Sequence, residues 1–160
     1  EAIILDIFPM DKSSRYYADM TRTVVKGEPN EELQRMYDAV LESQEAALGM
    51  IRAGVSGRDV HRKVSDILHE RGYKTLVHDQ QEGTPLRKGF IHGTGHGVGL
   101  EIHEAPRISP AADELRAGDV VTVEPGLYDP QLGGVRIEDL VVVTQDGGRN
   151  LTNFPKEFRL

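Results

Sequence analysis

The sequence predicts an α+β fold, with strands at both ends of the chain and helices between them. Three observations support this prediction: residues 1–25 are rich in β-forming side chains, helical periodicity follows to about residue 72, and β-rich runs return near residue 120. Because strands and helices are segregated along the chain, a doubly wound parallel sheet is disfavoured. One domain spanning residues 1–160 is expected, since a chain of this length with 38% hydrophobic residues buries a single core.

A β-hairpin is predicted at the start of the chain. Residues 3–5 and 16–25 are rich in β-branched or aromatic side chains, and turn-forming residues lie between them. An aspartate interrupts each apolar context, Asp6 in the first strand and Asp19 in the second. The turn formers are Pro9, Asp11, Ser13 and Ser14.

An amphipathic helix is predicted from about residue 30. Asn30 is a candidate N-cap followed by an acidic first turn, and Gly54 is expected to end the helix. Apolar residues recur with helical spacing between these limits, at Leu33, Met36, Tyr37, Val40, Leu41, Ala47, Leu48 and Ile51.

A second amphipathic helix is predicted directly afterwards. Ser56 and Asp59 resemble a capping box at its start, and the helix is expected to end near Gly72. Its histidines, His61 and His69, are expected on the solvent-facing side.

The rest of the chain is predicted to be mostly irregular or extended. Residues 77–88 are polar and irregular, and a Gly-rich segment and a loop rich in Pro and Ala follow them. Two β-rich runs, 120–128 and 135–144, are predicted as the last strands.

Composition excludes several classes of function. The sequence has no cysteine, so a disulfide framework, a thiolate zinc site and a cysteine nucleophile are all excluded. The formal net charge is −7 without a Lys/Arg cluster, so nucleic acid is not an expected partner. No apolar run approaches the length that crosses a bilayer, so no membrane partner is expected. A cytoplasmic location is expected instead.

Asp6 and Asp19 are the first candidate functional residues. A carboxylate inside a strand is disfavoured unless it is paired or ligated, because burying an uncompensated charge costs several kcal/mol. Neighbouring strands could bring the two carboxylates together. Asp6, beside Pro9 and Asp11, could equally be a turn or edge residue.

Three histidines gather in one Gly-rich segment, at His92, His96 and His103. Dense glycine makes a helical zinc-protease motif costly, at roughly 1 kcal/mol for each glycine, so an extended or looped segment is expected. A phosphate-binding loop fails on spacing, because no Lys follows and the third glycine of a dinucleotide fingerprint is missing. The segment therefore indicates a ligand-binding site in which side chains and backbone approach closely.

Glu124 and Glu138 are acids at otherwise apolar strand positions. Strand alternation puts Arg136 and Glu138 on one face, so a buried ion pair between them is the structural alternative to a functional role. Such a pair explains one glutamate but not Glu124, Asp6 and Asp19 as well.

Four carboxylates and one imidazole form a hard, oxygen-dominated ligand set suited to Mn, Co, Fe or Zn. Four negative charges in one place need at least one dication, and two are more comfortable. A pair of metal ions activates water and polarises the carbonyl that the water attacks, which is hydrolase chemistry.

Five ordered blocks resemble the pita-bread metallopeptidases, the family that includes methionine aminopeptidase, Xaa-Pro aminopeptidase and Xaa-Pro dipeptidase. The blocks are residues 5–9, 17–23, 92–106, 123–126 and 135–139. The resemblance implies a curved antiparallel sheet with helices packed on its outer face. Family members carry further structure upstream of the first metal ligand, so we expect the N-terminal part of this fold to be missing from the chain.

The resemblance also implies roles for individual residues. Asp6 would bind one metal ion, His96 and Glu124 the other, and Asp19 and Glu138 would bridge the two. His92 and His103 would contact substrate and stabilise the tetrahedral intermediate. Glu124 would shuttle a proton, and Arg136 would orient a ligand carboxylate.

The blocks look more like the proline-specific members than methionine aminopeptidases, which typically carry a Cys before the Gly-His-Gly. The implied reaction is hydrolysis of the N-terminal Xaa-Pro bond of peptides with proline second, by an aminopeptidase ahead of a dipeptidase, with manganese as the first choice of metal. A homo-oligomer is compatible with this reading. The alternatives are a catalytically silent peptide- or protein-binding module, a methionine aminopeptidase-like enzyme, and a relative acting on a small molecule.

Overall fold

The computed structural model describes residues 2–160, and it begins with the expected hairpin. Strand β1 (Ala2–Ile7) pairs antiparallel with β2 (Met20–Val25), and Asp6 lies opposite Thr21. The second strand is shorter than the predicted 16–25, because the Tyr17 N–H donates to the carbonyl of Gly99 instead of joining the ladder. Asp19 therefore lies one residue before β2 rather than inside a strand.

The first predicted helix is confirmed as α1 (Glu31–Leu48). The side chain of Asn30 caps it by accepting a hydrogen bond from the Leu33 N–H. The helix ends at the Gly49 C-cap, earlier than the expected Gly54. Gly54 instead adopts φ +83°, a left-handed conformation that suits glycine, in the turn before the next helix.

The second predicted helix is confirmed as α2 (Gly57–Glu70). Ser56 caps it, but its hydroxyl accepts from the Arg58 N–H, and the Asp59 N–H bonds to the Ser56 carbonyl. Neither of the two reciprocal side-chain bonds of the capping box expected of Ser56 and Asp59 is therefore formed, and Ser56 acts as a simple N-cap. Residues 77–88 were expected to be irregular, but the first of them belong to a short helix, α3 (Leu76–Asp79). The Thr75 side chain caps this helix.

The remaining strands form two antiparallel sheets. The larger has the order β4-β3-β5-β8-β9, and the smaller pairs β6 with β7. Each β-rich run predicted from the sequence is two strands, because the chain leaves the large sheet for the small one and returns. The bounds are β3 Gly95–Gly97, β4 Glu104–Ile108, β5 Val120–Val123, β6 Gly126–Asp129, β7 Gly133–Arg136, β8 Asp139–Val143 and β9 Gly148–Asn150.

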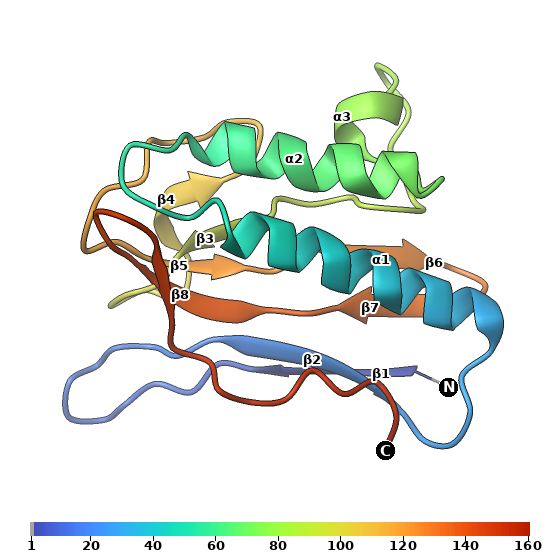
Figure 1. The fold of residues 1–160 in the computed structure, drawn as a ribbon, viewed down its shortest axis with the longest axis horizontal. Coiled ribbons are helices and arrows are strands. Elements are labelled where there is room, and N and C mark those ends of the chain that lie inside the picture. Colours follow the sequence, from blue (N-terminus) through green and yellow to red (C-terminus); the bar gives the residue numbers. More distant parts are fainter. Residues whose placement is uncertain (1) are drawn as a thin grey trace.

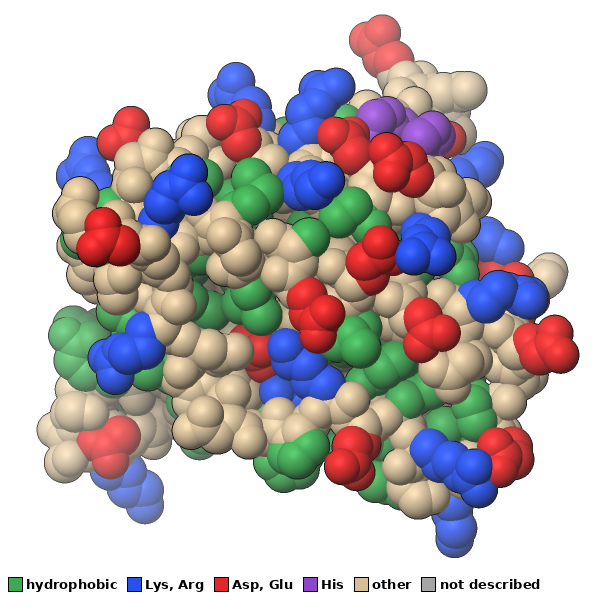
Figure 2. Space-filling model, viewed as in Figure 1, with side chains coloured by type: hydrophobic (Ala, Val, Ile, Leu, Met, Phe, Trp, Pro, Cys, Tyr) green, Lys and Arg blue, Asp and Glu red, His purple; other side chains and the backbone are tan. Residues whose placement is uncertain are grey.

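The helices cover one side of the strands, and the β1–β2 hairpin lies along the other edge (Figure 1). Helix α1 contacts β5, β6 and β7, and α2 contacts β4. The core lies between these layers, with Val40, Val64, Val121, Val123 and Ile137 fully buried. Figure 2 shows acidic, basic and apolar side chains interspersed over the helical face, without one dominant sign of charge.

The expected α+β class, with antiparallel sheets and helices on one face, is confirmed. Across residues 2–160, none of the helices combines the length and the apolar character that a membrane span requires.

Candidate active site

The hairpin carries the first two candidate ligands to one pocket. Asp6 lies in β1, and its carboxylate accepts a hydrogen bond from the Arg136 guanidinium. Asp19 is only 6% exposed. Both side chains line a pocket with Phe8 and Ile102.

His96 lies at the centre of β3, between β4 and β5. Glycines flank it because the backbone there is tightly enclosed: a Cβ at Gly95 would lie 2.0 Å from the Thr122 carbonyl oxygen. The Nε2 atom of His96 lies 3.8 Å from Asp19 Oδ2 and 3.3 Å from Glu124 Oε1. The expected extended conformation of this Gly-rich segment is thus realised at its second histidine.

Glu124 and Glu138 occupy equivalent junctions between the two sheets. Glu124 follows β5 where the chain leaves the large sheet, and Glu138 precedes β8 where the chain returns to it. The sequence predicted both glutamates at strand positions, and this is wrong, because Glu124 lies just after β5 and Glu138 just before β8. The junctions free both side chains from the alternation of the strand, and both line the pocket that holds Asp6, Asp19 and His96.

The pocket thus brings together all five residues predicted as metal ligands, with His103 beside them. Asp19, His96 and Glu138 each offer a ligand atom, and these atoms lie within 4.8 Å of one another. Glu124 lies beside this trio, with Oε1 3.3 Å from His96 Nε2.

Electrostatics of the cluster fit a cation. Burial, followed by the charge of Asp6, raises the pKa of Asp19 to about 6. Burial raises the pKa of Glu124 to about 7 and, reinforced by the charges of Glu124 and Asp19, that of Glu138 to about 9. Burial also lowers the pKa of His96, which keeps the imidazole neutral. Crowded buried carboxylates beside a neutral imidazole are the donor set that a divalent cation stabilises.

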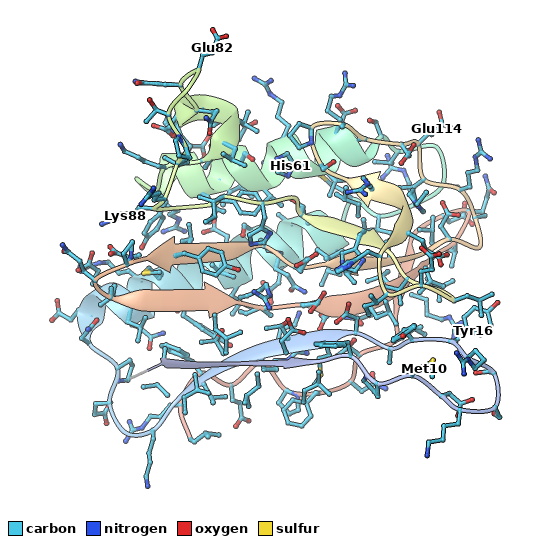
Figure 3. The ribbon with its side chains drawn as sticks, turned by 180° about the vertical axis from the view of Figure 1, so that it is seen from behind. Met10, Tyr16, His61, Glu82, Lys88 and Glu114 are labelled. Atoms are coloured by element: carbon cyan, nitrogen blue, oxygen red, sulfur yellow. The ribbon has the colours of Figure 1, made fainter. Side chains whose placement is uncertain are left out.

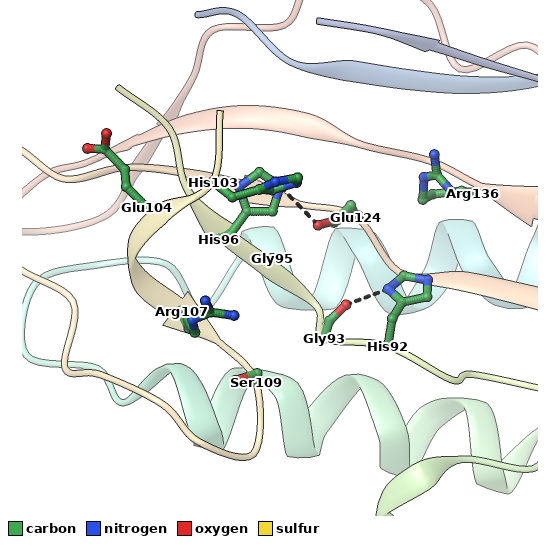
Figure 4. A pocket seen from close by; sticks show the side chains of 10 residues that line it. All are labelled: His92, Gly93, Gly95, His96, His103, Glu104, Arg107, Ser109, Glu124 and Arg136. Carbon is green, nitrogen blue, oxygen red and sulfur yellow. Dashed lines mark hydrogen bonds and ion pairs between the residues drawn. The ribbon is translucent and has the colours of Figure 1, made fainter. Parts of the chain in front are cut away.

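A second pocket of about 280 Å³ opens beside the cluster (Figure 4). Figure 4 shows His92, His103 and Arg107 around this space together with His96 and Glu124. The His103 ring lies 4.3 Å from the His96 ring, centroid to centroid. The predicted substrate-contacting histidines therefore border the same space as the predicted ligands.

Arg136 does not form the ion pair with Glu138 that strand alternation offered as an alternative. Its guanidinium bonds instead to Asp6 and, at 3.0 Å, to the Tyr128 hydroxyl. Glu138 Oε2 accepts a 2.6 Å hydrogen bond from the Thr21 hydroxyl. Arg136 Nε also donates to the Thr21 hydroxyl, at 3.3 Å, so the Arg136 and Glu138 side chains lie on one side as strand alternation predicted, but they meet at Thr21 and form no ion pair with each other.

Comparison with known proteins identifies the family. The model of metallopeptidase family M24 matches residues 1–145. The chain is 42% identical over 145 residues to the Xaa-Pro dipeptidase of Pyrococcus furiosus, covering 90% of this chain and 38% of that protein. The chain belongs to metallopeptidase family M24.

Solved structures agree with this M24 assignment and with the pita-bread fold. A dipeptidase from Pyrococcus horikoshii OT3 matches with a TM-score of 0.85 at 40% identity, over 99% of this chain and 40% of that one. An X-Pro aminopeptidase from Thermotoga maritima MSB8 also gives 0.85, at 37% identity, over 99% and 42%. The M24 chain spans about two fifths of the length of these relatives.

Sequence reasoning missed several residues of this M24 site. The Tyr128 hydroxyl lies 3.0 Å from His92 Nε2 as well as from Arg136, so it links two predicted site residues. Arg107 pairs in register with His96 across β3 and β4. The position of Tyr128 four residues after Glu124 and that of Arg107 four after His103 are the only signals, and neither has meaning before the strands are paired.

His61 was predicted to face solvent, and this prediction is wrong. The side chain is 1% exposed, and Nδ1 lies 2.9 Å from the Thr94 hydroxyl. Figure 3 labels His61 on helix α2. Phe90 packs between the His61 and His92 rings, with centroids at 5.3 and 5.2 Å. Burial lowers the pKa of His61 to about 4, so this histidine is a neutral part of the core behind the site.

Proposed function

We propose that residues 1–160 form the metal-binding part of the catalytic domain of a proline-specific exopeptidase. The observation that carries the proposal is the convergence of Asp6, Asp19, His96, Glu124 and Glu138 on one pocket. The named activities of the relatives, Xaa-Pro dipeptidase and X-Pro aminopeptidase, support the substrate class.

We infer that these five side chains bind two divalent ions. Mn²⁺ is the first choice, before Co²⁺, Zn²⁺ and Fe²⁺. When bound, they supply Lewis-acid chemistry that lowers the pKa of a water molecule and polarises a peptide carbonyl. Asp19 and Glu138 suit the bridging positions, because both are buried within the trio of closely spaced ligands.

Glu124 is proposed as the proton shuttle. Its carboxylate lies next to His96 and also lines the substrate pocket, so it can reach both the attacking water and the leaving amine.

His92 and His103 differ in what they can donate. His92 Nδ1 lies 2.7 Å from the Gly93 carbonyl, which only accepts, so Nδ1 carries the proton. Burial lowers the pKa of His92 to about 4, so the ring is neutral and Nε2 is an acceptor, here for the Tyr128 hydroxyl. We therefore propose His103 as the hydrogen-bond donor to the developing oxyanion and His92 as a substrate-orienting acceptor.

Arg107 offers a way to separate the two candidate activities. It is exposed, lines the pocket, and makes no ion pair among the described residues 2–160. A guanidinium in this place suits the free carboxylate of a dipeptide, whereas a longer peptide would present an amide there. This feature favours short substrates.

The test is turnover of an Xaa-Pro dipeptide and an Xaa-Pro-Yaa tripeptide by the full-length protein after reconstitution with Mn²⁺ or Co²⁺. Release of the first residue is expected, with Arg107→Gln raising KM for the dipeptide at least about 10-fold and leaving the tripeptide nearly unchanged. Arg116→Gln, an exposed arginine on a neighbouring loop, is the control. Metal binding without turnover of any Xaa-Pro peptide would favour the silent binding module, and release of methionine from peptides without proline would favour the methionine aminopeptidase-like enzyme.

A further inference from the structure

A fully buried carboxylate lies directly behind the site. Asp139 follows the predicted ligand Glu138 and has no exposed surface. It accepts hydrogen bonds from Arg22 at 2.8 Å, Gln44 at 3.1 Å, Asn150 at 2.8 Å and Lys156 at 2.9 Å. We call these five side chains the Asp139 network.

Stability alone is a poor reason for such a network. Taking an aspartate and an arginine out of water costs several kcal/mol for each ion, and well-packed apolar residues often serve stability equally well. What the charged groups add is a fixed geometry, since each has several directional bonds.

Arg22 ties together the two backbone segments that carry the proposed bridging ligands. Its Nη1 atom donates to the carbonyls of Thr21, at 2.9 Å, and Glu138, at 2.6 Å. The same two residues bond directly, through the Glu138 N–H to the Thr21 carbonyl and through the Thr21 hydroxyl to the Glu138 carboxylate. Because Asp19 lies two residues before Thr21, this joint sets the distance between Asp19 and Glu138.

The network also reaches the strand before the third ligand. Gln44 Nε2 bonds to Asp139 and makes a longer contact, 3.4 Å, with the carbonyl of Val123. Val123 is the last residue of β5, and Glu124 follows it. Three of the five proposed ligands are thus attached to backbone that the Asp139 network contacts.

The C-terminal segment closes the network. Arg22 donates to the carbonyls of Phe154, at 2.8 Å, and Pro155, at 3.0 Å. Lys156 Nζ donates to Gln44 Oε1 at 2.7 Å as well as to Asp139. The Phe158 ring stacks on Tyr37 of α1 at 4.2 Å and anchors the segment. Figure 1 shows this segment running back beside β2.

We propose that the Asp139 network, closed by residues 154–156 of the C-terminal segment, positions Asp19, Glu124 and Glu138 for metal binding. The five side chains of the Asp139 network are positioning residues, since none of them lines the pocket. The proposal rests on the metal-binding function proposed above. The C-terminal segment is then a structural part of the metal site, although it contributes no ligand.

The test is Arg22→Lys, which keeps a cation beside Asp139 but lacks the fork that reaches four carbonyls. We expect the affinity for Mn²⁺ to fall about 10- to 100-fold, the usual effect of removing a group that orients a ligand. Affinity is measured by calorimetric titration of the full-length protein at a temperature where circular dichroism shows the metal-free variant to be folded. Arg35→Lys, an exposed arginine on α1, is the matched control and should titrate like the wild type.

Lys156→Met is the second variant, and it keeps the proposal testable if Arg22→Lys does not fold. It leaves the Arg22–Asp139 pair in place and removes a contact of the C-terminal segment, so a smaller loss of Mn²⁺ affinity is expected. Folded variants that bind Mn²⁺ like the wild type, even with lower melting temperatures, would overturn the proposal. Absence of Mn²⁺ binding by the wild type would instead refute the metal-binding function itself.

Discussion

Glu124 is the residue proposed both to bind metal and to transfer a proton. Glu124→Gln keeps the size of the side chain but removes its capacity to accept a proton, so kcat on an Xaa-Pro peptide is expected to fall at least about 100-fold. Glu101→Gln, an exposed acid in the neighbouring loop, is the control. Steady-state kinetics with saturating Mn²⁺ measure the difference, and an unchanged kcat would exclude the shuttle role.

His61 makes a prediction about pH and stability. Its pKa is about 4 when folded and about 6.5 when unfolded, so the unfolded chain binds more protons between these values. Its contribution to stability is complete above pH 6.5 and is lost as the pH falls toward 4. From pH 7 to pH 5 we expect the wild type to lose about 2 kcal/mol relative to His61→Gln, measured by urea unfolding. Parallel pH dependences of the two proteins would contradict the burial of a neutral imidazole.

At the residue scale, the sequence was a better guide to the side chains that line the pocket than to the partners of those side chains. Aspartates in apolar strands and histidines among glycines are unusual enough to be recognised without a fold. The partners come from far along the chain: Asp6 meets Arg136, and His61 meets Thr94. A helical pattern cannot tell a buried histidine from an exposed one, because the hydroxyl that satisfies it belongs to another element.

At the scale of elements, β3 depends on glycine. A Cβ at Gly95 would lie 2.0 Å from a backbone oxygen of Thr122, and backbone cannot move aside without disturbing β5. Gly95→Ala is expected to lower the free energy of unfolding by more than about 2 kcal/mol. Gly147→Ala, where a Cβ meets nothing within 4 Å, should change it by less than about 0.5 kcal/mol. Thermal unfolding of both variants measures the difference. Equal stabilities of Gly95→Ala and Gly147→Ala would show that β3 tolerates a side chain.

Element boundaries explain the main errors of sequence prediction. Residues 120–128 and 135–144 each read as one strand, because Pro125 and Ile137 interrupt no hydrophobic pattern. In the structure each run changes sheets at its glutamate, and this crossing presents Glu124 and Glu138 to the pocket. Such a crossing depends on how the sheets pack, which local sequence does not encode.

At the scale of the molecule, the metal-free site opposes folding at neutral pH. The pKa values of Asp19, Glu124 and Glu138 are raised to about 6, 7 and 9, so the folded chain binds more protons than the unfolded chain above about pH 4. Stability of the metal-free protein is therefore expected to fall as the pH rises from 5 to 8. A dication offsets this repulsion, so Mn²⁺ should raise the melting temperature by several degrees, and by more at pH 8 than at pH 5.5. Calorimetric melting with and without EDTA measures this, and an equal effect of Mn²⁺ at both pH values would contradict it.

The remaining expectations concern the whole protein: manganese as the metal, a cytoplasmic location, a homo-oligomer, and no nucleic-acid partner. All four stay predictions. The family and the fold are established at this scale, whereas the activity belongs to a protein whose relatives are more than twice as long as this chain.

The central claim is that five side chains from distant parts of the chain hold two metal ions. The most direct measurement is the number of Mn²⁺ ions bound by the wild type and by Asp19→Ala, counted by native mass spectrometry. We predict two ions in the wild type and at most one in the variant, because Asp19 is proposed to bridge the two ions. Two ions retained in a folded Asp19→Ala protein, or none in the wild type, would contradict the account.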